Sequence, residues 1–161
     1  MLFLIASVHS KAALAMGAEG MNMGTAFMAT AESPIHAGIK KALCDADERS
    51  TTHIFRTLGN TERVYKNAQA LKVREIEAES PGDFSAVWPY VKGELYRQSF
   101  QETGDPESSV WSCGQSIGLI DEVVTCQELV TTIVDEAAAI IQHRLGSMVV
   151  TPASASIHAK L

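Results

Sequence analysis

Residues 17–30, with the sequence GAEGMNMGTAFMAT, contain the groups best suited to bind a ligand. Gly24 has no Cβ, so a ligand can approach the backbone closely there. The amides of Gly24 and Thr25 and the Thr25 hydroxyl can all donate hydrogen bonds to phosphate oxygens. Met21 and Met23 lie two residues apart, on one side of an extended segment. The run predicts a buried strand followed by a phosphate-binding turn, and an ordinary tight turn is the alternative for an isolated Gly-Thr pair.

The residue spacing gives little support for a metal site or a disulfide framework. The five histidines show no HExxH or similar metal-ligating pattern, and the three cysteines have an odd count and no CxxC spacing. We therefore expect no metal site, no disulfide framework, and reduced thiols in a cytoplasmic protein. The aromatic side chains could form a ring-stacking site, but core or interface packing is the more common role, and we expect packing for Phe55, Phe84, Trp88, Tyr90, Tyr96 and Trp111.

The net charge of −6 and the sequence pI near 5.3 argue against binding to nucleic acid, and no basic stripe is present. Residues 1–8 are apolar but have neither a basic region before them nor a clear cleavage site, so they do not resemble a signal peptide. They are also much shorter than the roughly 20 residues that span a bilayer. We therefore expect no membrane association.

The elements that must position residues 17–30 follow from local patterns. A helix is expected at Lys11–Met16, closed by Gly17. A short strand is expected at about Gly20–Phe27, and parallel pairing with Leu2–Ala6 would make a β-α-β unit.

Downstream, the pattern is mainly helical. Ser33 and Pro34 predict the N-cap and first turn of a helix. An extended piece is expected at Thr51–Arg56, followed by a helix from Asn60 to about Ala78 with one apolar side. Thr125–Glu128 has the pattern of a capping box, which predicts a last helix with a broad apolar face that ends at Gly146.

Residues 17–30 resemble the last β/α unit of the nitronate monooxygenases, which are FMN enzymes built on a (β/α)8 barrel. The family pattern is similar to G-A-x-G-V/I-x-x-G-T-R-F, except that Ala26 stands here where arginine is usual. Residues 110–120 (VWSCGQSIGLI) resemble the family segment W-S-x-G-Q-x-x-G-L-I. Arg56, Arg63 and Asn67 match an extended stretch and helix of the family, so the resemblance covers most of residues 11–145.

The resemblance implies an FMN-binding site at Met23, Gly24 and Thr25, with Ser112 and Gln115 facing the flavin. For Gln115, an exposed helix start is the alternative. Gly114 and Gly118 are expected to allow close packing rather than to bind a ligand. The family's catalytic base is a histidine well upstream of the phosphate loop, and no residue here corresponds to it, so no catalytic residue is assigned.

A (β/α)8 barrel needs roughly 250 residues, whereas this chain has 161. The expected fold class is therefore α/β, the C-terminal fragment of a TIM-barrel flavoenzyme with its helical extension, mostly helical as it stands. We expect residues 1–30 to be the last barrel unit with an atypical N-terminus, 31–145 a helical region, and 146–161 a flexible tail. The first ten residues lack the family's Gly-Gly pair, which suggests a truncated product with a foreign N-terminus joined near Ser10, or simply a divergent or partial sequence.

Three functions follow as hypotheses. The first is an FMN-dependent oxidoreductase that converts an alkyl nitronate to a carbonyl compound and nitrite. The second is a flavin-type enoyl-acyl carrier protein reductase that uses a nicotinamide donor. The third is a non-catalytic remnant, or a fragment that completes a separate N-terminal barrel half. An apolar face left exposed by the absent barrel predicts aggregation, a homo-oligomer or such a partner.

Overall fold

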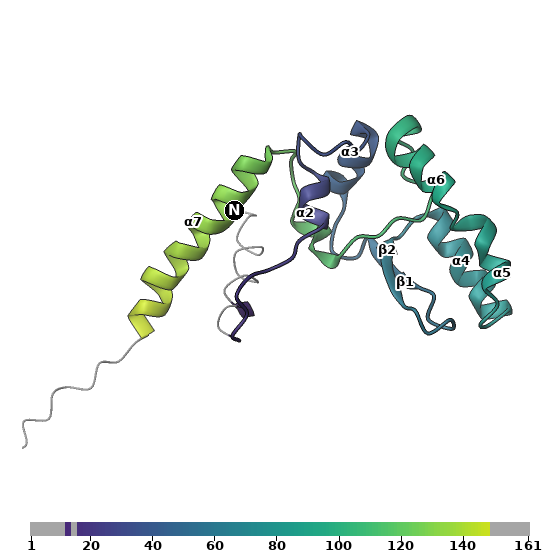
Figure 1. The fold of residues 1–161 in the computed structure, drawn as a ribbon, viewed down its shortest axis with the longest axis horizontal. Coiled ribbons are helices and arrows are strands. Elements are labelled where there is room, and N and C mark those ends of the chain that lie inside the picture. The colour runs from purple at the N-terminus through teal and green to yellow at the C-terminus, as the bar shows by residue number, and fades with distance from the viewer. Residues whose placement is uncertain (1–11, 14–15, 149–161) are drawn as a thin grey trace, which may run out of the picture.

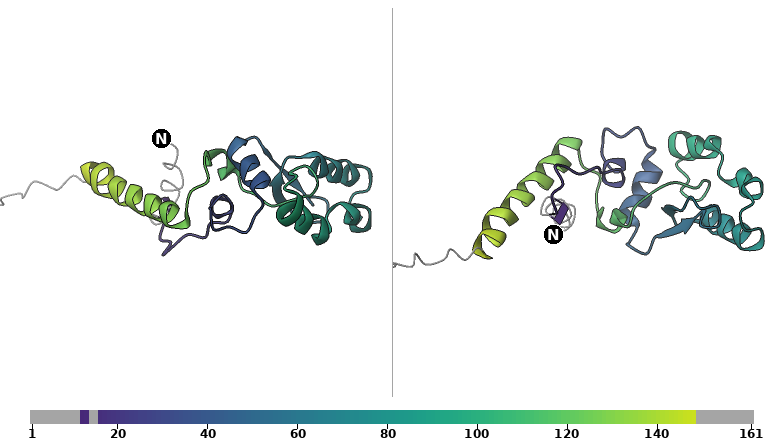
Figure 2. Two further views of the ribbon diagram at one scale, coloured as in Figure 1. Left: turned by 90° about the horizontal axis from the view of Figure 1, so that it is seen from above. Right: turned by 60° about the horizontal axis from the view of Figure 1, so that its bottom comes forward.

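The computed structural model describes residues 12–13 and 16–148, most of which are helical (Figure 1). This part of the chain is elongated, with α7 projecting at one end and α4 to α6 at the other (Figure 2). With η marking 3-10 and π turns, the elements are α2 (Thr25–Met28), α3 (Ala37–Asp45), β1 (Thr51–Ile54), β2 (Glu62–Tyr65), α4 (Ala68–Glu79), α5 (Phe84–Val87), η1 (Trp88–Tyr90), α6 (Gly93–Arg97), η2 (Gln98–Thr103), η3 (Gln115–Leu119), α7 (Cys126–Ala139), η4 (Ile140–Leu145) and η5 (Gly146–Met148).

β1 and β2 form an antiparallel hairpin in which Thr51 lies opposite Tyr65 and Ile54 lies opposite Glu62. The prediction of an extended piece at residues 51–56 is confirmed for β1. The two strands are the whole of the regular sheet in the described residues.

The prediction of a helix from Asn60 is wrong, because residues 62–65 are β2 and α4 begins only after Asn67. The Asn67 side chain caps α4 by accepting a hydrogen bond from Ala70 N at 2.8 Å. Upstream of this cap, the β-branched and aromatic side chains of Val64 and Tyr65 favour a strand. The cap residue, rather than the apolar spacing, therefore marks where the helix starts.

The prediction of a strand at Gly20–Phe27 is also wrong. Residues 20–23 are irregular, and α2 follows, with a hydrogen bond from Met28 N to Gly24 O at 3.2 Å. A buried parallel strand needs neighbouring strands to satisfy its backbone groups. The described residues offer no such neighbour, so the segment forms local helical bonds instead. The expected partner Leu2–Ala6 and residues 149–161 lie outside the described residues.

α3 begins later than expected. Its N-cap is His36 rather than Ser33, and His36 Nδ1 accepts a hydrogen bond from Gly38 N at 3.0 Å. His36 is thus an exposed residue at a helix start. Gly38 lies against the backbone of Gly104, where an added Cβ would overlap the Gly104 carbonyl. This close approach joins α3 to the end of η2.

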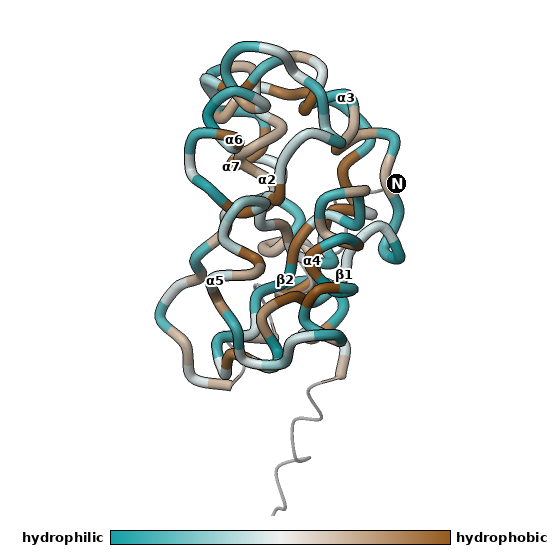
Figure 3. The backbone as a smooth tube through the Cα atoms, turned by 90° about the vertical axis from the view of Figure 1, so that its right-hand side faces the viewer, coloured by the Kyte–Doolittle hydropathy of each residue, from teal (hydrophilic) through white to brown (hydrophobic). Residues whose placement is uncertain are grey.

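The interior divides into two apolar clusters, and brown segments of β2 and α4 mark the second in Figure 3. The central cluster packs α2 and α3 against η2, η3 and residues 111–113, and contains Ala29, Ile39, Leu43, Phe100, Trp111, Cys113 and Ile117. The second cluster packs the hairpin against α4 and α5, and contains Ile54, Val64, Ala70, Val73 and Val87. β2 borders both clusters, since Tyr65 packs against the first and Val64 belongs to the second.

α7 begins at the predicted capping box. Thr125 Oγ1 accepts from Glu128 N at 3.1 Å, and the Glu128 carboxylate accepts from Thr125 N at 2.8 Å. The helical run continues through η4 and then η5 to Met148, so it does not end at Gly146 as expected. The broad apolar face is covered only in part: Leu129 and Ile133 are buried, whereas four other side chains are exposed, namely Val130, Val134, Ile141 and Leu145. Among the described helices, none is both long enough and apolar enough to cross a membrane.

Candidate functional site

Residues 111–113 run beside β2 and form an isolated antiparallel bridge, in which Ser112 pairs with Val64. Tyr65 N donates to Trp111 O at 3.0 Å, and Cys113 N donates to Arg63 O at 3.2 Å. The Trp111 ring is buried and stacks on Tyr65 with a centroid distance of 4.4 Å. These contacts fix the backbone on both sides of Ser112.

α2 is tied to this segment by one long-range hydrogen bond. Gly114 N donates to Thr25 Oγ1 at 2.9 Å, across 89 residues of sequence. Because the hydroxyl oxygen acts as acceptor here, the Thr25 O–H remains able to donate to a ligand. At Gly24, a Cβ would meet no atom within 4 Å, so the backbone there is open to a ligand. The arrangement brings one hydroxyl and the first amides of α2 to one place.

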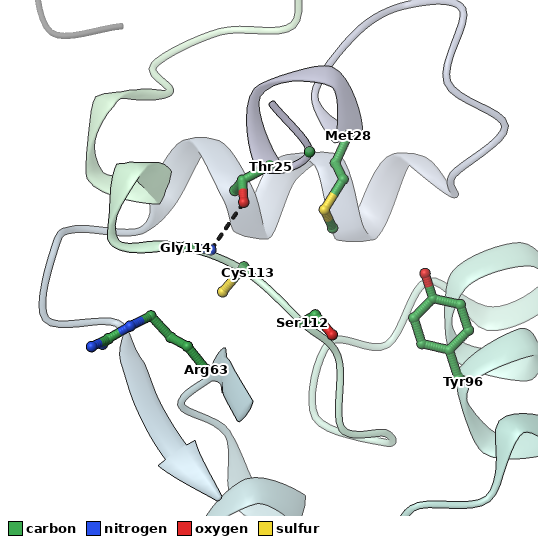
Figure 4. Close-up of a pocket in the computed structure, with 8 residues that line it drawn as sticks. Thr25, Met28, Arg63, Tyr96, Ser112, Cys113 and Gly114 are labelled. Atoms are coloured by element: carbon green, nitrogen blue, oxygen red, sulfur yellow. Dashed lines mark hydrogen bonds between the residues drawn. The ribbon is translucent and has the colours of Figure 1, made fainter. Parts of the chain in front are cut away.

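A cavity of about 520 Å³ lies where these elements meet (Figure 4). It is bordered by three of the predicted site residues, Gly24, Thr25 and Ser112. The remaining lining residues come from α2, β2, α6 and the segment after Ser112, and are Met28, Arg63, Tyr96, Cys113 and Gly114. The structure thus gathers residues that are far apart in the sequence around one hollow.

The other two predicted site residues do not line this cavity. Met23 is half-buried in the irregular run before Gly24, and Gln115 is exposed as the first residue of η3. Gln115 thus has the exposed helix-start position that was the alternative. Gly118 packs closely, as expected, since a Cβ there would overlap the backbone of Glu48.

Arg63 is one of the lining residues that the sequence did not assign to the site. It carries the only charge among the lining residues, and its Nη1 donates to Thr51 Oγ1 at 2.9 Å. We expected Arg63 on a helix, whereas it lies on β2 beside the Cys113 backbone. A guanidinium matches phosphate geometry, so Arg63 supplies the cavity with a cation that Ala26 cannot. The signal that could have found it is the strand propensity of residues 62–65.

Cys113 lines the cavity but is not suited to act as a nucleophile. Burial raises its pKa to about 12, and nearby Arg63 lowers it only in part. At pH 8 we therefore expect iodoacetamide to alkylate Cys113 roughly a thousandfold more slowly than the same thiol in the urea-unfolded chain, because only the thiolate reacts. Peptide mass spectrometry over a time course measures this ratio. Equal rates in the folded and unfolded chain would contradict it.

The packing role expected of the aromatic residues is confirmed for Trp111, which is 1% exposed. Phe84, Trp88 and Tyr96 are 49%, 49% and 43% exposed, so they are not core residues. Phe84 contacts Trp88 with a centroid distance of 5.7 Å, and Tyr96 stacks on Phe100 at 4.2 Å, so a role in interface packing stays a prediction. The exposed rings lie on the short elements α5, η1 and α6. They border a second cavity, considered below.

The donors around the first cavity fit the phosphate end of a flavin nucleotide. The first amides of α2 have no carbonyl partner within the helix. Thr25 and Arg63 line the same hollow, and the Arg63 guanidinium is turned toward Thr51 (Figure 4). All of these groups donate hydrogen bonds, as a phosphate requires. Within residues 12–13 and 16–148, no group of three or more His, Cys, Asp or Glu side chains is placed to hold a metal ion.

The fold is that of the C-terminal part of a (β/α)8 flavoenzyme barrel with its helical extension, as expected. FabK from Thermotoga maritima is similar at 28% identity and a TM-score of 0.76, over 92% of this chain and 52% of that chain. Nitroalkane oxidase from Streptomyces ansochromogenes is similar at 25% identity and a TM-score of 0.64, over 84% of this chain and 38% of that chain. The chain belongs to the nitronate monooxygenase family, whose model matches residues 5–136.

The enoyl reductase domain of MlnA from Bacillus amyloliquefaciens shares the fold at 12% identity, with a TM-score of 0.69 over 89% of this chain and 48% of that chain. The chain therefore spans about half the length, or less, of these solved structures. Membership of the family supports a flavin as cofactor.

Proposed function

We propose that this chain carries the phosphate-binding end of an FMN-dependent oxidoreductase of the nitronate monooxygenase type. Its substrate would be an alkyl nitronate, and the products a carbonyl compound and nitrite. The observation that carries the proposal is the hydrogen bond from Gly114 N to Thr25 Oγ1, which joins the two matched family segments around one cavity.

In this proposal the residues of the chain bind and orient. The Thr25 hydroxyl and the first amides of α2 would donate to the phosphate, and Arg63 would balance its charge. The Gly114 amide would hold the Thr25 oxygen in place, so that its O–H points toward the ligand. Bound FMN would supply the redox chemistry by accepting electrons from the substrate. Ser112 would border the site from the segment beside β2.

FabK is the specific reason to keep an enoyl-acyl carrier protein reductase as the second candidate, since it is similar at 28% identity. The two candidates differ in their reductant. Nitrite release from an alkyl nitronate with oxygen uptake supports the first, and oxidation of a nicotinamide in the presence of an enoyl thioester supports the second.

No residue of the chain is assigned as a catalytic base, and the chain spans about half the length of FabK. We therefore propose that turnover requires the remaining barrel half, which could be supplied as a separately expressed partner. A non-catalytic chain that only binds the cofactor, or that forms homo-oligomers, is the alternative. Adding the N-terminal half of a family relative and assaying nitrite would separate the two.

The binding test uses the Thr25 hydroxyl. We expect Thr25→Val to weaken FMN binding by about 10- to 100-fold, the effect of removing a hydrogen bond to a charged group. Quenching of flavin fluorescence on titration with protein measures the affinity. Thr25→Ser retains the hydroxyl and should bind within a few-fold of the parent chain.

Riboflavin, which lacks the phosphate, is the matched ligand control. Its affinity should be low and should not respond to Thr25→Val, because the lost contact is to the phosphate. Equal affinities of the parent chain and the valine variant for FMN would refute the proposed site.

A further inference from the structure

A second cavity, of about 400 Å³, adjoins the first and shares Ser112 and Tyr96 with it. Figure 4 shows these two residues on the side of the first cavity away from Arg63. Five lining residues of the second cavity are aromatic, namely Phe55, Phe84, Trp88, Tyr96 and Trp111. Its volume falls within the range of small-molecule pockets, about 300–1,000 Å³.

Glu62 is the only charged residue that lines this second cavity. It is adjacent to Arg63 on β2, and successive strand residues point to opposite faces. The carboxylate and the guanidinium consequently border different cavities. Ser112 Oγ donates to Glu62 Oε1, which orients the carboxylate at the wall that both cavities share.

No ion pair within the described part of the chain neutralises Glu62. A half-buried carboxylate in a cavity that aromatic side chains also line favours a positive charge, because both carboxylates and π-systems attract cations. Trp88 also lines a further hollow, together with Lys92 and Glu94. The charge of Glu94 offsets that of Lys92 there. The local charge therefore favours an organic cation over an anionic or neutral ligand.

We propose that the aromatic cavity beside Glu62 binds a compact organic cation of the methylated-ammonium class. The positive group would lie against the Glu62 carboxylate and the Trp88 ring, with the apolar part of the ligand on the remaining aromatic walls. This site goes beyond the flavin site and does not depend on FMN binding.

Choline and its neutral isostere 3,3-dimethylbutan-1-ol provide a direct test. They have the same shape, but choline has a positively charged nitrogen where the alcohol has a carbon atom. The chain has two tryptophans, and both line this cavity, so intrinsic fluorescence reports its occupancy. We expect saturable binding of choline, about tenfold tighter than binding of the alcohol.

Glu62→Gln should weaken choline binding by about tenfold and leave the affinity for the alcohol unchanged, because glutamine can still accept from Ser112. Glu79→Gln removes an exposed charge outside the cavity and should leave both affinities unchanged. In a second variant, Trp88→Leu, Trp111 remains as the reporter, and choline binding should again weaken.

Circular dichroism must show that each variant is folded. The proposal is overturned if choline does not bind the parent chain, if the alcohol binds as tightly as choline, or if folded Glu62→Gln and Trp88→Leu both retain the parent affinity for choline.

Discussion

Replacing Trp111 with alanine is expected to lower the free energy of unfolding by about 3–5 kcal/mol, the range measured for deleting a large buried aromatic side chain. Trp111 is 1% exposed, stacks on Tyr65 at 4.4 Å and meets the edge of Phe100 at 5.5 Å. Its indole Nε1 also donates to Pro106 O at 3.2 Å. The change would leave a cavity and remove this hydrogen bond, although Pro106 O keeps a second donor, Asn67 Nδ2 at 2.6 Å. Since small domains are stable by about 5–15 kcal/mol, much of the stability would be lost.

Urea unfolding followed by circular dichroism at 222 nm measures the effect of Trp111→Ala without relying on tryptophan emission. Trp88→Ala is the matched control, because the same side chain is removed from a position that is 49% exposed. We expect the control to change stability by less than about 1 kcal/mol. Equal losses in the two variants would show that the stacked cluster does not hold the fold together.

Trp111 also matters for the site, because Ser112, Cys113 and Gly114 follow it directly. Its ring anchors one end of the segment, and the bond to Thr25 anchors the other. If the anchor is lost, Thr25 loses the amide that fixes its hydroxyl. FMN binding is therefore expected to fall with stability in Trp111→Ala, but not in Trp88→Ala.

Local signals in the sequence predicted those elements whose determinants are local. The capping box at Thr125–Glu128 was predicted correctly because both hydrogen bonds form within four residues. The start of α4 was misplaced because apolar residues at helical spacing continue back through Val64, which is buried on the hairpin instead. The strand at Gly20–Phe27 failed because a strand depends on partners that its own sequence does not specify.

The site residues also divide into those with local determinants and those whose position depends on distant segments. Gly24 and Thr25 could be found as a pair because adjacent residues form the turn. Arg63 was missed: strand propensity could have placed it on β2, but its position at the cavity also depends on the register between β2 and residues 111–113. The match at residues 110–120 pointed to Ser112, but which side chain faces the cavity is decided by the strand-like pairing of that segment.

Glu77→Ala is expected to destabilise the chain by about 1.5–3 kcal/mol, because it removes a buried carboxylate that accepts three hydrogen bonds. The Glu77 carboxylate is 6% exposed. It accepts hydrogen bonds from Phe55 N at 2.8 Å, Thr57 N at 3.2 Å and Thr57 Oγ1 at 3.0 Å. Phe55 has φ 59°, a left-handed conformation that is unfavourable for a bulky side chain. The carboxylate therefore holds a strained turn at the end of β1.

Urea unfolding of Glu77→Ala and of Glu79→Ala provides the comparison. Glu79 is exposed on the same helix, and its removal should change stability by no more than about 0.5 kcal/mol. Glu77→Gln should lie between them, since an amide has one acceptor oxygen where the carboxylate uses two. Because Phe55 also borders the aromatic cavity, choline binding should weaken in Glu77→Ala even where the chain stays folded. A Glu77→Ala chain as stable as Glu79→Ala would mean that the turn is held by the hairpin alone.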